Sequence, residues 1–244
     1  MSNADGVARS GVFLPWDSDF FGFRIGRAQG NRLTSAAREE LLRWCGDERI
    51  RCLYFLADGE DGATLEQAHV GDFKFVDLRV DFAIELAHAV ALRSPTEFRP
   101  VRFEEISVIE SMARGAHTDT RFFKDTGFPA ARAADLYARW IQRDFREHRV
   151  LVVGGPDGAV AGYVTCQLDA ASGIGRIGLI AVAEAARGRG LGRALVQGAL
   201  AWFRENGCRE VRVATQGTNL VAQRLYQAFG FRTAETSVTF HRWF

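Results

Sequence analysis

Three arginines and three glycines share one short stretch, Arg187-Gly188-Arg189-Gly190-Leu191-Gly192-Arg193. It follows the apolar segment 179–182 after a short polar turn, and it opens a predicted helix, 190–206. Glycine lets a backbone approach a ligand closely, and the free amides of a first helical turn favour a phosphate. Arginine adds charge-assisted hydrogen bonds. These residue types at this spacing predict a phosphate-binding turn; the alternative is a glycine-rich turn with solvated arginines.

A second candidate group lies on a later predicted helix, 219–229. Asn219 takes the N-cap position, where its side chain can accept a hydrogen bond from a free amide, and Gly230 suits the position after the last helical residue. Tyr226 follows Asn219 by seven residues, which is two helical turns, so both side chains lie along nearly the same face. An amide and a phenol could therefore line one groove, whereas the alternative for Tyr226 is a packing residue of an amphipathic helix.

Other patterns that carry chemistry are out of context or absent. The segment 173–178 matches GxGxxG, but it precedes a strand and no helix follows, so we expect a hairpin turn there. The sequence has no GxxxxGK[ST], HExxH or GxSxG motif. Its four cysteines and five histidines lack metal-ligand spacing, so we expect no metal; His117 and His241 are histidines that could belong to a site, with hydrogen-bonded structural roles as the alternative.

The elements that must position these groups alternate between strands and helices, which predicts an α/β fold. After residue 99 we expect strands at 99–103, 150–153, 159–168, 175–183, 210–215 and 231–243, and helices at 104–116, 130–147, 190–206 and 219–229. Before residue 91 we expect a helix from about residue 35, a strand at 52–57, a short helix at 62–70 and a β-rich segment at 73–86. In that last segment, Phe75, Leu78, Val80, Phe82 and Ile84 largely alternate.

Pro95 and Pro100 frame a polar stretch between these two sets of elements. We therefore expect two domains, a smaller N-terminal α/β domain at 1–95 and a second domain at 99–244. The length of 244 residues suits one or two domains.

Composition limits the function further. Apolar residues make up 47% of the chain and charged residues 25%, with a net charge of +1. This ordinary globular balance gives no sign of a nucleic-acid or membrane partner. No apolar run reaches the roughly 18 residues of a membrane-spanning helix, and the first residues lack an apolar signal-peptide core. The four scattered cysteines suggest reduced core thiols, so we expect a cytoplasmic protein.

The segment 180–182, the stretch 187–193 and the pattern Asn219-x6-Tyr226-x3-Gly230-Phe231 together resemble the GNAT superfamily of acetyl-CoA-dependent N-acetyltransferases. The resemblance covers about residues 99–244. It implies the GNAT fold, with a mixed central sheet and splayed strands: strand 175–182 would diverge from strand 210–215 and open a cleft.

The resemblance assigns acetyl-CoA to these motifs. The backbone of 180–182 would pair with the pantetheine amides, and the stretch 187–193 would hold the pyrophosphate. Asn219 would bond the cofactor arm, and Tyr226 would protonate the departing thiolate. The residues assigned to the cofactor are Ile180, Ala181, Val182, Arg187, Gly188, Arg189, Gly190, Leu191, Gly192, Arg193 and Asn219.

Many members of the superfamily carry a carboxylate base near this strand, but 175–182 contains none. A substrate amine that is partly neutral near pH 7 would make such a base unnecessary.

Segments 16–22, 121–125, 136–140 and 240–243 are similar to the dTDP-fucosamine acetyltransferase group. Members of this group acetylate the amine of a nucleotide-linked 4-amino-4,6-dideoxy sugar and carry an extra N-terminal α/β domain. The similarity implies that Arg121, Phe122 and Phe123 bind the substrate.

Three functions fit these residues. The first is N-acetylation of a small-molecule amine, in particular a nucleotide-linked aminosugar. The second is N-acetylation of a protein or peptide amine, and the third is a non-enzymatic acyl-CoA-binding module. Tyr226 argues against the third, because a sensor needs no phenol there, and the added N-terminal domain favours the first. The oligomeric state stays open, with a homodimer among the options.

Overall fold

The structure, a computed structural model, describes residues 6–89, 97–155 and 158–244. The chain forms two compact units. Unit 1 comprises Met1–Arg79, Asp119–Arg132 and Thr236–Phe244, and unit 2 comprises Val80–Thr118 and Ala133–Glu235. This grouping differs from the predicted linear division at 1–95 and 99–244, because two later segments belong with the N-terminal residues. Most of the predicted boundary, 90–96, lies outside the described residues.

The strands form one mixed sheet in the order β1-β2-β3-β10-β4-β9-β8-β7-β6-β5, so the predicted α/β class with a mixed central sheet is confirmed. Two long strands, β4 (Lys74–Glu85) and β10 (Arg232–Trp243), each contribute residues to both units. Within the described ranges, no helix combines the length and the apolar character that crossing a membrane requires.

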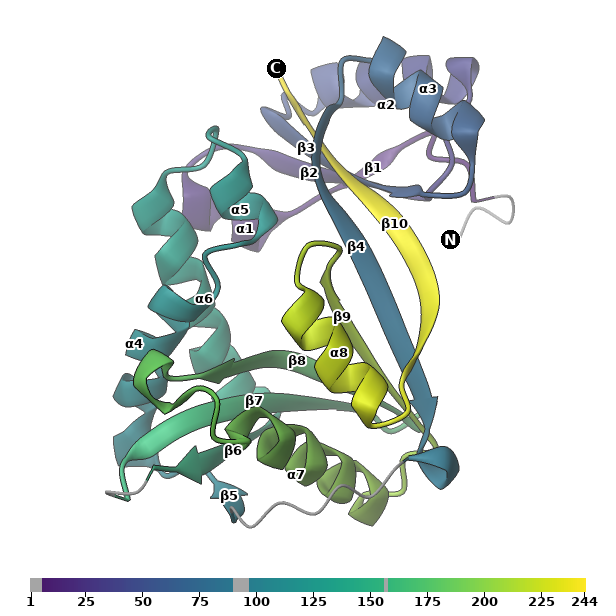
Figure 1. The fold of residues 1–244 in the computed structure, drawn as a ribbon. Helices are drawn as coiled ribbons and strands as arrows, with labels where there is room; N and C mark the ends of the chain where they lie inside the picture. The colour runs from purple at the N-terminus through teal and green to yellow at the C-terminus, as the bar shows by residue number, and fades with distance from the viewer. Residues whose placement is uncertain (1–5, 90–96, 156–157) are drawn as a thin grey trace. The chain divides into compact units, whose positions relative to one another are not determined.

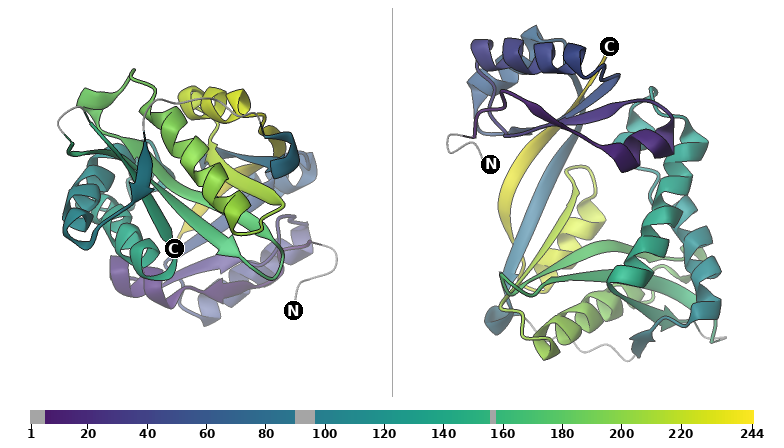
Figure 2. Two further views of the ribbon diagram at one scale, coloured as in Figure 1. Left: turned by 90° about the horizontal axis from the view of Figure 1, so that it is seen from below. Right: turned by 180° about the vertical axis from the view of Figure 1, so that it is seen from behind.

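Unit 1 brings the last strand of the chain beside an early one. Val238 of β10 pairs with Ala57 of β3 in an antiparallel register, and β3 pairs in parallel with β2. Helices α2 and α3 lie together on one side of this part of the sheet (Figure 2). Thr34 caps α2 by accepting a hydrogen bond from the Ala37 amide. The elements of unit 1 are β1 (Gly11–Phe13), α1 (Pro15–Phe21), β2 (Ile25–Ala28), α2 (Ser35–Asp47), β3 (Cys52–Asp58), α3 (Gly62–Val70) and α5 (Arg121–Lys124).

In unit 2, helix α7 packs against strands β6, β7 and β8 (Figure 1). Its buried face carries Leu195, Ala199 and Phe203, each fully buried. The hairpin turn expected at 173–178 lies slightly earlier, at residues 170–173, and residues 174–178 form the start of β8 and open no helix. The elements of unit 2 are β5 (Phe98–Pro100), α4 (Ile106–Ala116), α6 (Ala130–Glu147, from Ala133 onward), β6 (Arg149–Gly154), β7 (Val160–Asp169), β8 (Ile174–Val182), α7 (Leu191–Glu205), β9 (Glu210–Gln216) and α8 (Leu220–Ala228).

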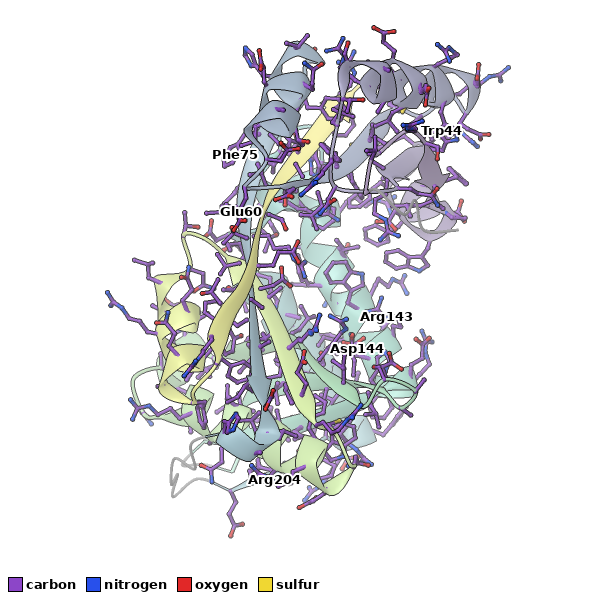
Figure 3. The ribbon with its side chains drawn as sticks, turned by 90° about the vertical axis from the view of Figure 1, so that its right-hand side faces the viewer. Trp44, Glu60, Phe75, Arg143, Asp144 and Arg204 are labelled. Atoms are coloured by element: carbon purple, nitrogen blue, oxygen red, sulfur yellow. The ribbon has the colours of Figure 1, made fainter. Side chains whose placement is uncertain are left out.

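The predicted alternation in segment 73–86 is wrong at its start. Phe75, labelled in Figure 3, and Leu78 are 59% and 39% exposed, whereas Val76 is buried. Asp77, next to Val76, is also buried, so both faces of β4 are covered at this point. From Val80 onward the buried positions alternate as predicted.

Two other details bear on the predictions. The predicted strand 99–103 is shorter, because a 3-10 turn at Phe103–Glu105 leads into α4. The four cysteines are buried free thiols, in agreement with the expected core role.

Candidate functional site

A cavity of about 580 Å³ in unit 2 lies between the end of β8, the first turn of α7 and one face of α8. Most of the predicted cofactor residues line it. The lining residues are Ala116, Ile180, Ala181, Val182, Ala186, Arg187, Gly188, Gly190, Leu191, Gly192, Arg193, Asn219, Val221, Ala222, Leu225 and Tyr226.

The cavity opens where two parallel strands separate. β8 and β9 pair from Ile174 opposite Glu210 to Ile177 opposite Val213. Both strands continue beyond this register, to Val182 and Gln216, and their ribbons diverge (Figure 1). The splayed strands predicted from the sequence are therefore present, and the far half of β8 has one free edge.

A β-bulge in β8 marks the start of this free edge. Val164 of β7 pairs with Ile180, and the next pair joins Cys166 to Ile177. One β7 residue, Thr165, thus faces two β8 residues, which is the geometry of a bulge. The amide of Leu179 donates to Oγ1 of Thr165 at 2.9 Å.

Glycine is required in this bulge. A Cβ atom at Gly178 would lie 2.5 Å from Oγ1 of Thr165, which is far inside van der Waals contact. The bulge bends the strand and directs its last residues away from β9.

The backbone of the free edge can pair with an extended ligand. The amide of Ala183 donates to the carbonyl of Ala161 on the β7 side. Because amides alternate along an antiparallel strand, those of Val182 and Ile180 face the opposite edge, where β9 has ended its pairing. An unpaired strand edge can form hydrogen bonds with ligand amides and carbonyls that are spaced as they are in a β-strand.

The glycine-rich turn provides an open cradle beside this edge. Gly188 and Gly190 have φ angles of +77° and +79°, and a Cβ atom at either would meet nothing within 4 Å. Gly190 is the N-cap of α7 and has no side chain to accept from the first-turn amides. These amides and the helix dipole are suited to an anion.

The arginines of the turn differ in position. Arg187 and Arg193 line the cavity and are exposed, and Nε of Arg187 donates to the Val182 carbonyl at 3.4 Å. Arg189 is exposed and does not line the cavity. Two of the three predicted phosphate-binding arginines are thus at the cavity wall.

Asn219 and Tyr226 share the same cavity. The predicted N-cap is confirmed, because Oδ1 of Asn219 accepts from the Ala222 amide at 3.1 Å, which leaves its amino group as a donor for a ligand. Tyr226 is 2% exposed and its ring packs near Phe82 and Phe231. Burial raises the pKa of Tyr226, so the phenol keeps its proton at neutral pH.

No carboxylate is among the described residues that line the cavity. Outside the cavity lining, Nε2 of His117 lies 2.8 Å from the hydroxyl of Tyr163 on β7. The His117 ring stacks on that of Tyr137. Asp144 of α6 is 1% exposed and accepts from Arg143 through Oδ1 (Figure 3). Sequence periodicity on β7 and α6 could not reveal these contacts, because they join segments far apart in the chain.

The three predicted substrate residues lie in unit 1. Phe122 is 1% exposed and packs against Phe21 and Phe128, so its side chain is part of an aromatic core. Phe123 is half-buried, as is Arg121, whose guanidinium lies 4.2 Å above the Tyr54 ring. Their contact with a substrate stays a prediction.

Comparison with known proteins identifies the class. Residues 117–231 match the Acetyltransferase (GNAT) family. A GCN5-related N-acetyltransferase from Sphaerobacter thermophilus has the same fold, with a TM-score of 0.65 at 17% identity over 90% of this chain and 72% of that one. One from Kribbella flavida gives 0.64 at 14% identity over 98% and 92%. The chain therefore carries a GNAT acetyltransferase domain and is an acyltransferase.

A curated relative extends the similarity to nearly the whole chain. The dTDP-fucosamine acetyltransferase of Escherichia coli O6:H1 is 28% identical over 94% of this chain and 96% of that protein. Members of the GNAT family use acetyl-CoA as co-substrate. The open glycine cradle, the free strand edge and the apolar cavity wall fit a phosphate, a pantetheine chain and a thioester.

Proposed function

We propose that this protein transfers the acetyl group of acetyl-CoA to the primary amine of a nucleotide-linked amino-deoxysugar. The observation that carries the proposal is that the free edge of β8, the glycine cradle and Tyr226 line one cavity. A phosphate site, a strand edge and a neutral phenol are the three groups that acetyl transfer from a thioester needs.

In this proposal each part of the cavity holds one part of acetyl-CoA. The amides that begin α7 bind the pyrophosphate, with Arg187 and Arg193 supplying charge-assisted hydrogen bonds. The backbone of Ile180 and Val182 pairs with the pantetheine amides. Asn219 donates through its amino group to the same arm.

The reaction proposed is a direct transfer. The neutral amine attacks the thioester carbonyl, so an N–C bond forms and the C–S bond breaks. Tyr226 donates its phenolic proton to the sulfur as the thiolate leaves, and the proton lost by the amine passes to solvent. Strand amides at the free edge of β8 stabilise the oxyanion. A phenol whose pKa is raised by burial is fully protonated at the pH of the reaction.

The choice of acceptor follows the relative that matches nearly the whole chain, which is named for a nucleotide-linked aminosugar. Unit 1 extends beyond the matched family region of 117–231, which is consistent with an added substrate-binding part. Arg121 and Phe123 are the residues of the predicted substrate segment with accessible side chains. The cytoplasmic location and the oligomeric state stay predictions.

A thioester-consumption assay tests this function. The purified protein is offered acetyl-CoA with a panel of nucleotide-linked 4-amino and 3-amino deoxysugars, free aminosugars, small amines and peptides. We expect a kcat/KM for one nucleotide aminosugar at least about a hundredfold above every peptide. Efficient turnover of a peptide amine with none of any nucleotide sugar would overturn the proposed substrate.

A further inference from the structure

Unit 1 contains a buried network of hydrogen-bonded polar side chains that the proposed acetyl-transfer chemistry does not use. Asp125 and His241 are 1% and 0% exposed, and Nδ1 of His241 lies 2.7 Å from Oδ2 of Asp125. The indole of Trp243 donates to the same carboxylate oxygen at 2.9 Å, and the Gly127 amide donates to Oδ1 at 3.1 Å. The carboxylate is therefore held from three directions.

The other imidazole nitrogen meets Arg121. Nη1 of Arg121 lies 3.5 Å from Nε2 of His241. A guanidinium is only a donor, so this contact needs Nε2 as an acceptor and places the proton on Nδ1, facing Asp125. Burial lowers the pKa of His241 to about 4, in keeping with a neutral ring. Burial alone would raise the pKa of Asp125, but the hydrogen bonds that it accepts outweigh this and lower it.

Aromatic rings fix the other side of Arg121. Its guanidinium carbon is 4.2 Å from the Tyr54 ring centre and 4.5 Å from that of Phe122, which are cation–π distances. The rings and His241 thus hold the guanidinium plane in one place. An arginine fixed in this way presents its remaining N–H groups as a rigid fork.

The charges around Arg121 leave it available to an anion. Lys74 and Lys124, the two lysines of the chain, are paired with Asp125 and Asp77 respectively. Among the ion pairs of the described residues, none includes Arg121.

A second observation points to a ligand. The hydroxyl of Tyr54, on the ring beneath Arg121, is buried and has no hydrogen-bond partner in the described part of the chain. Leaving such a buried donor without an acceptor is unfavourable. An oxygen of a bound ligand would remove this cost.

We propose that Arg121 binds the diphosphate of the nucleotide-linked substrate, that Tyr54 donates to the same group, and that Asp125 and His241 act as positioning residues for Arg121. Arginine suits phosphate oxygens because its fork can donate two parallel hydrogen bonds. This inference rests on the proposed function only for the identity of the ligand; the anion site stands on the contacts within unit 1.

Calorimetry with thymidine 5′-diphosphate tests the site on the full-length protein. The protein is first saturated with coenzyme A, so that the phosphate cradle of unit 2 is filled. We expect wild type to bind the diphosphate and to bind thymidine, which lacks phosphates, at least about tenfold more weakly. Equal affinity for thymidine, or no binding of the diphosphate, would overturn the proposal.

Variants separate the roles. Arg121→Met keeps much of the side-chain stem and removes the charge, and we expect it to weaken diphosphate binding about 10–100-fold, the range of one or two charge-assisted hydrogen bonds. Arg121→Lys should recover only part of this affinity, because lysine lacks the fork. Arg43→Met, which removes an exposed arginine from α2 of the same unit, is the matched control and should bind as wild type does.

His241→Asn tests the positioning role. Asparagine keeps a donor toward Asp125 and lacks the acceptor that faces Arg121, so we expect a KM for the nucleotide sugar several-fold higher with an unchanged KM for acetyl-CoA. A purely structural role predicts instead a lower melting temperature with wild-type diphosphate affinity in both Arg121→Met and His241→Asn, and that result would refute the inference. The experiments distinguish failure of this inference from failure of the proposed function. If Arg121 binds the diphosphate but no nucleotide sugar is turned over, only the proposed function is contradicted.

Discussion

Nε2 of His117 and the hydroxyl oxygen of Tyr163 lie 2.8 Å apart, although 46 residues separate them in the chain. His117 directly follows Ala116, which lines the cavity, and Tyr163 pairs with Ala181 of the cavity strand. A part-buried histidine–tyrosine contact therefore adjoins the wall of the cavity proposed to bind acetyl-CoA. Its protonation state bears on the stability of unit 2.

The first prediction concerns acid stability. Burial lowers the pKa of His117 from its ordinary value of 6.5 to about 4. Between these values the unfolded chain binds more protons at this residue than the folded chain does, so stability is retained above pH 6.5 and falls as the pH drops toward 4. His117→Asn should therefore lose less free energy of unfolding per pH unit than wild type does. The difference should be a fraction of about 1.4 kcal/mol per pH unit, which is the slope for one proton that binds only to the unfolded chain.

Urea unfolding of wild type and His117→Asn at pH 7, 6 and 5 measures the effect. The pKa of His241 is lowered in the same direction, so some acid sensitivity should remain in the variant. Parallel pH dependences of the two proteins would show that His117 titrates alike in the folded and unfolded states.

The second prediction concerns the glycine cradle. Valine at position 190 would adopt a φ of +79° and place its Cβ in the empty space beside the helix start. We expect Gly190→Val to lose about 1–2 kcal/mol of stability from backbone strain and to lose most of its acetyl-CoA affinity, because the side chain blocks the approach of a phosphate.

Gly207→Val is the matched control for this substitution. Gly207 follows the other end of α7 and has a φ of +76°, and a Cβ atom added there would also meet nothing within 4 Å. It should show similar strain with unchanged acetyl-CoA affinity by calorimetry. Equal loss of affinity in both variants would mean that strain, and not the cradle, controls binding.

Local signals in the sequence predict much of this fold. The predicted helix 190–206 agrees with α7, because a glycine turn precedes it and Asn206-Gly207 ends it. The cavity motifs were predictable for the same reason, since each lies on one strand end or one helix. The contact between Asp125 and His241 joins residues 116 positions apart, and no local pattern encodes such a pairing. The burial of Asp77 beside Val76, with Leu78 exposed, likewise depends on what packs on each side of β4.

The third prediction concerns the bulge in β8. Thr165→Val keeps the shape of the side chain and removes the oxygen that accepts from the Leu179 amide at 2.9 Å. The Leu179 amide is half-buried, and a fully buried amide without an acceptor costs about 1–3 kcal/mol, so the variant should lose at most that much stability. Relaxation of the bulge should also weaken acetyl-CoA binding by up to about tenfold, which corresponds to about 1.4 kcal/mol.

Thr165→Ser keeps the hydroxyl and serves as the control for the bulge. It should retain the acetyl-CoA affinity of wild type even if the missing methyl group lowers its stability. Should Thr165→Val bind acetyl-CoA as tightly as wild type, the hydrogen bond to Leu179 would have no part in shaping the free edge.

The last prediction concerns Tyr226. Its ring is buried near Phe82 and Phe231, so Tyr226→Phe keeps this packing and removes only the hydroxyl. The contacts proposed for acetyl-CoA come from the backbone of β8, the cradle and Asn219, so KM for acetyl-CoA should stay unchanged. We expect kcat to fall about 10²–10⁴-fold, the range for losing a positioned general acid. A loss in kcat alone is the pattern of an interaction made in the transition state.

Burial raises the pKa of Tyr226, so the wild-type rate should hold as the pH rises through 8 and 9. Full kcat in Tyr226→Phe would assign the proton to another donor or leave the thiolate unprotonated, and a lower melting temperature with weaker acetyl-CoA binding would make Tyr226 a packing residue.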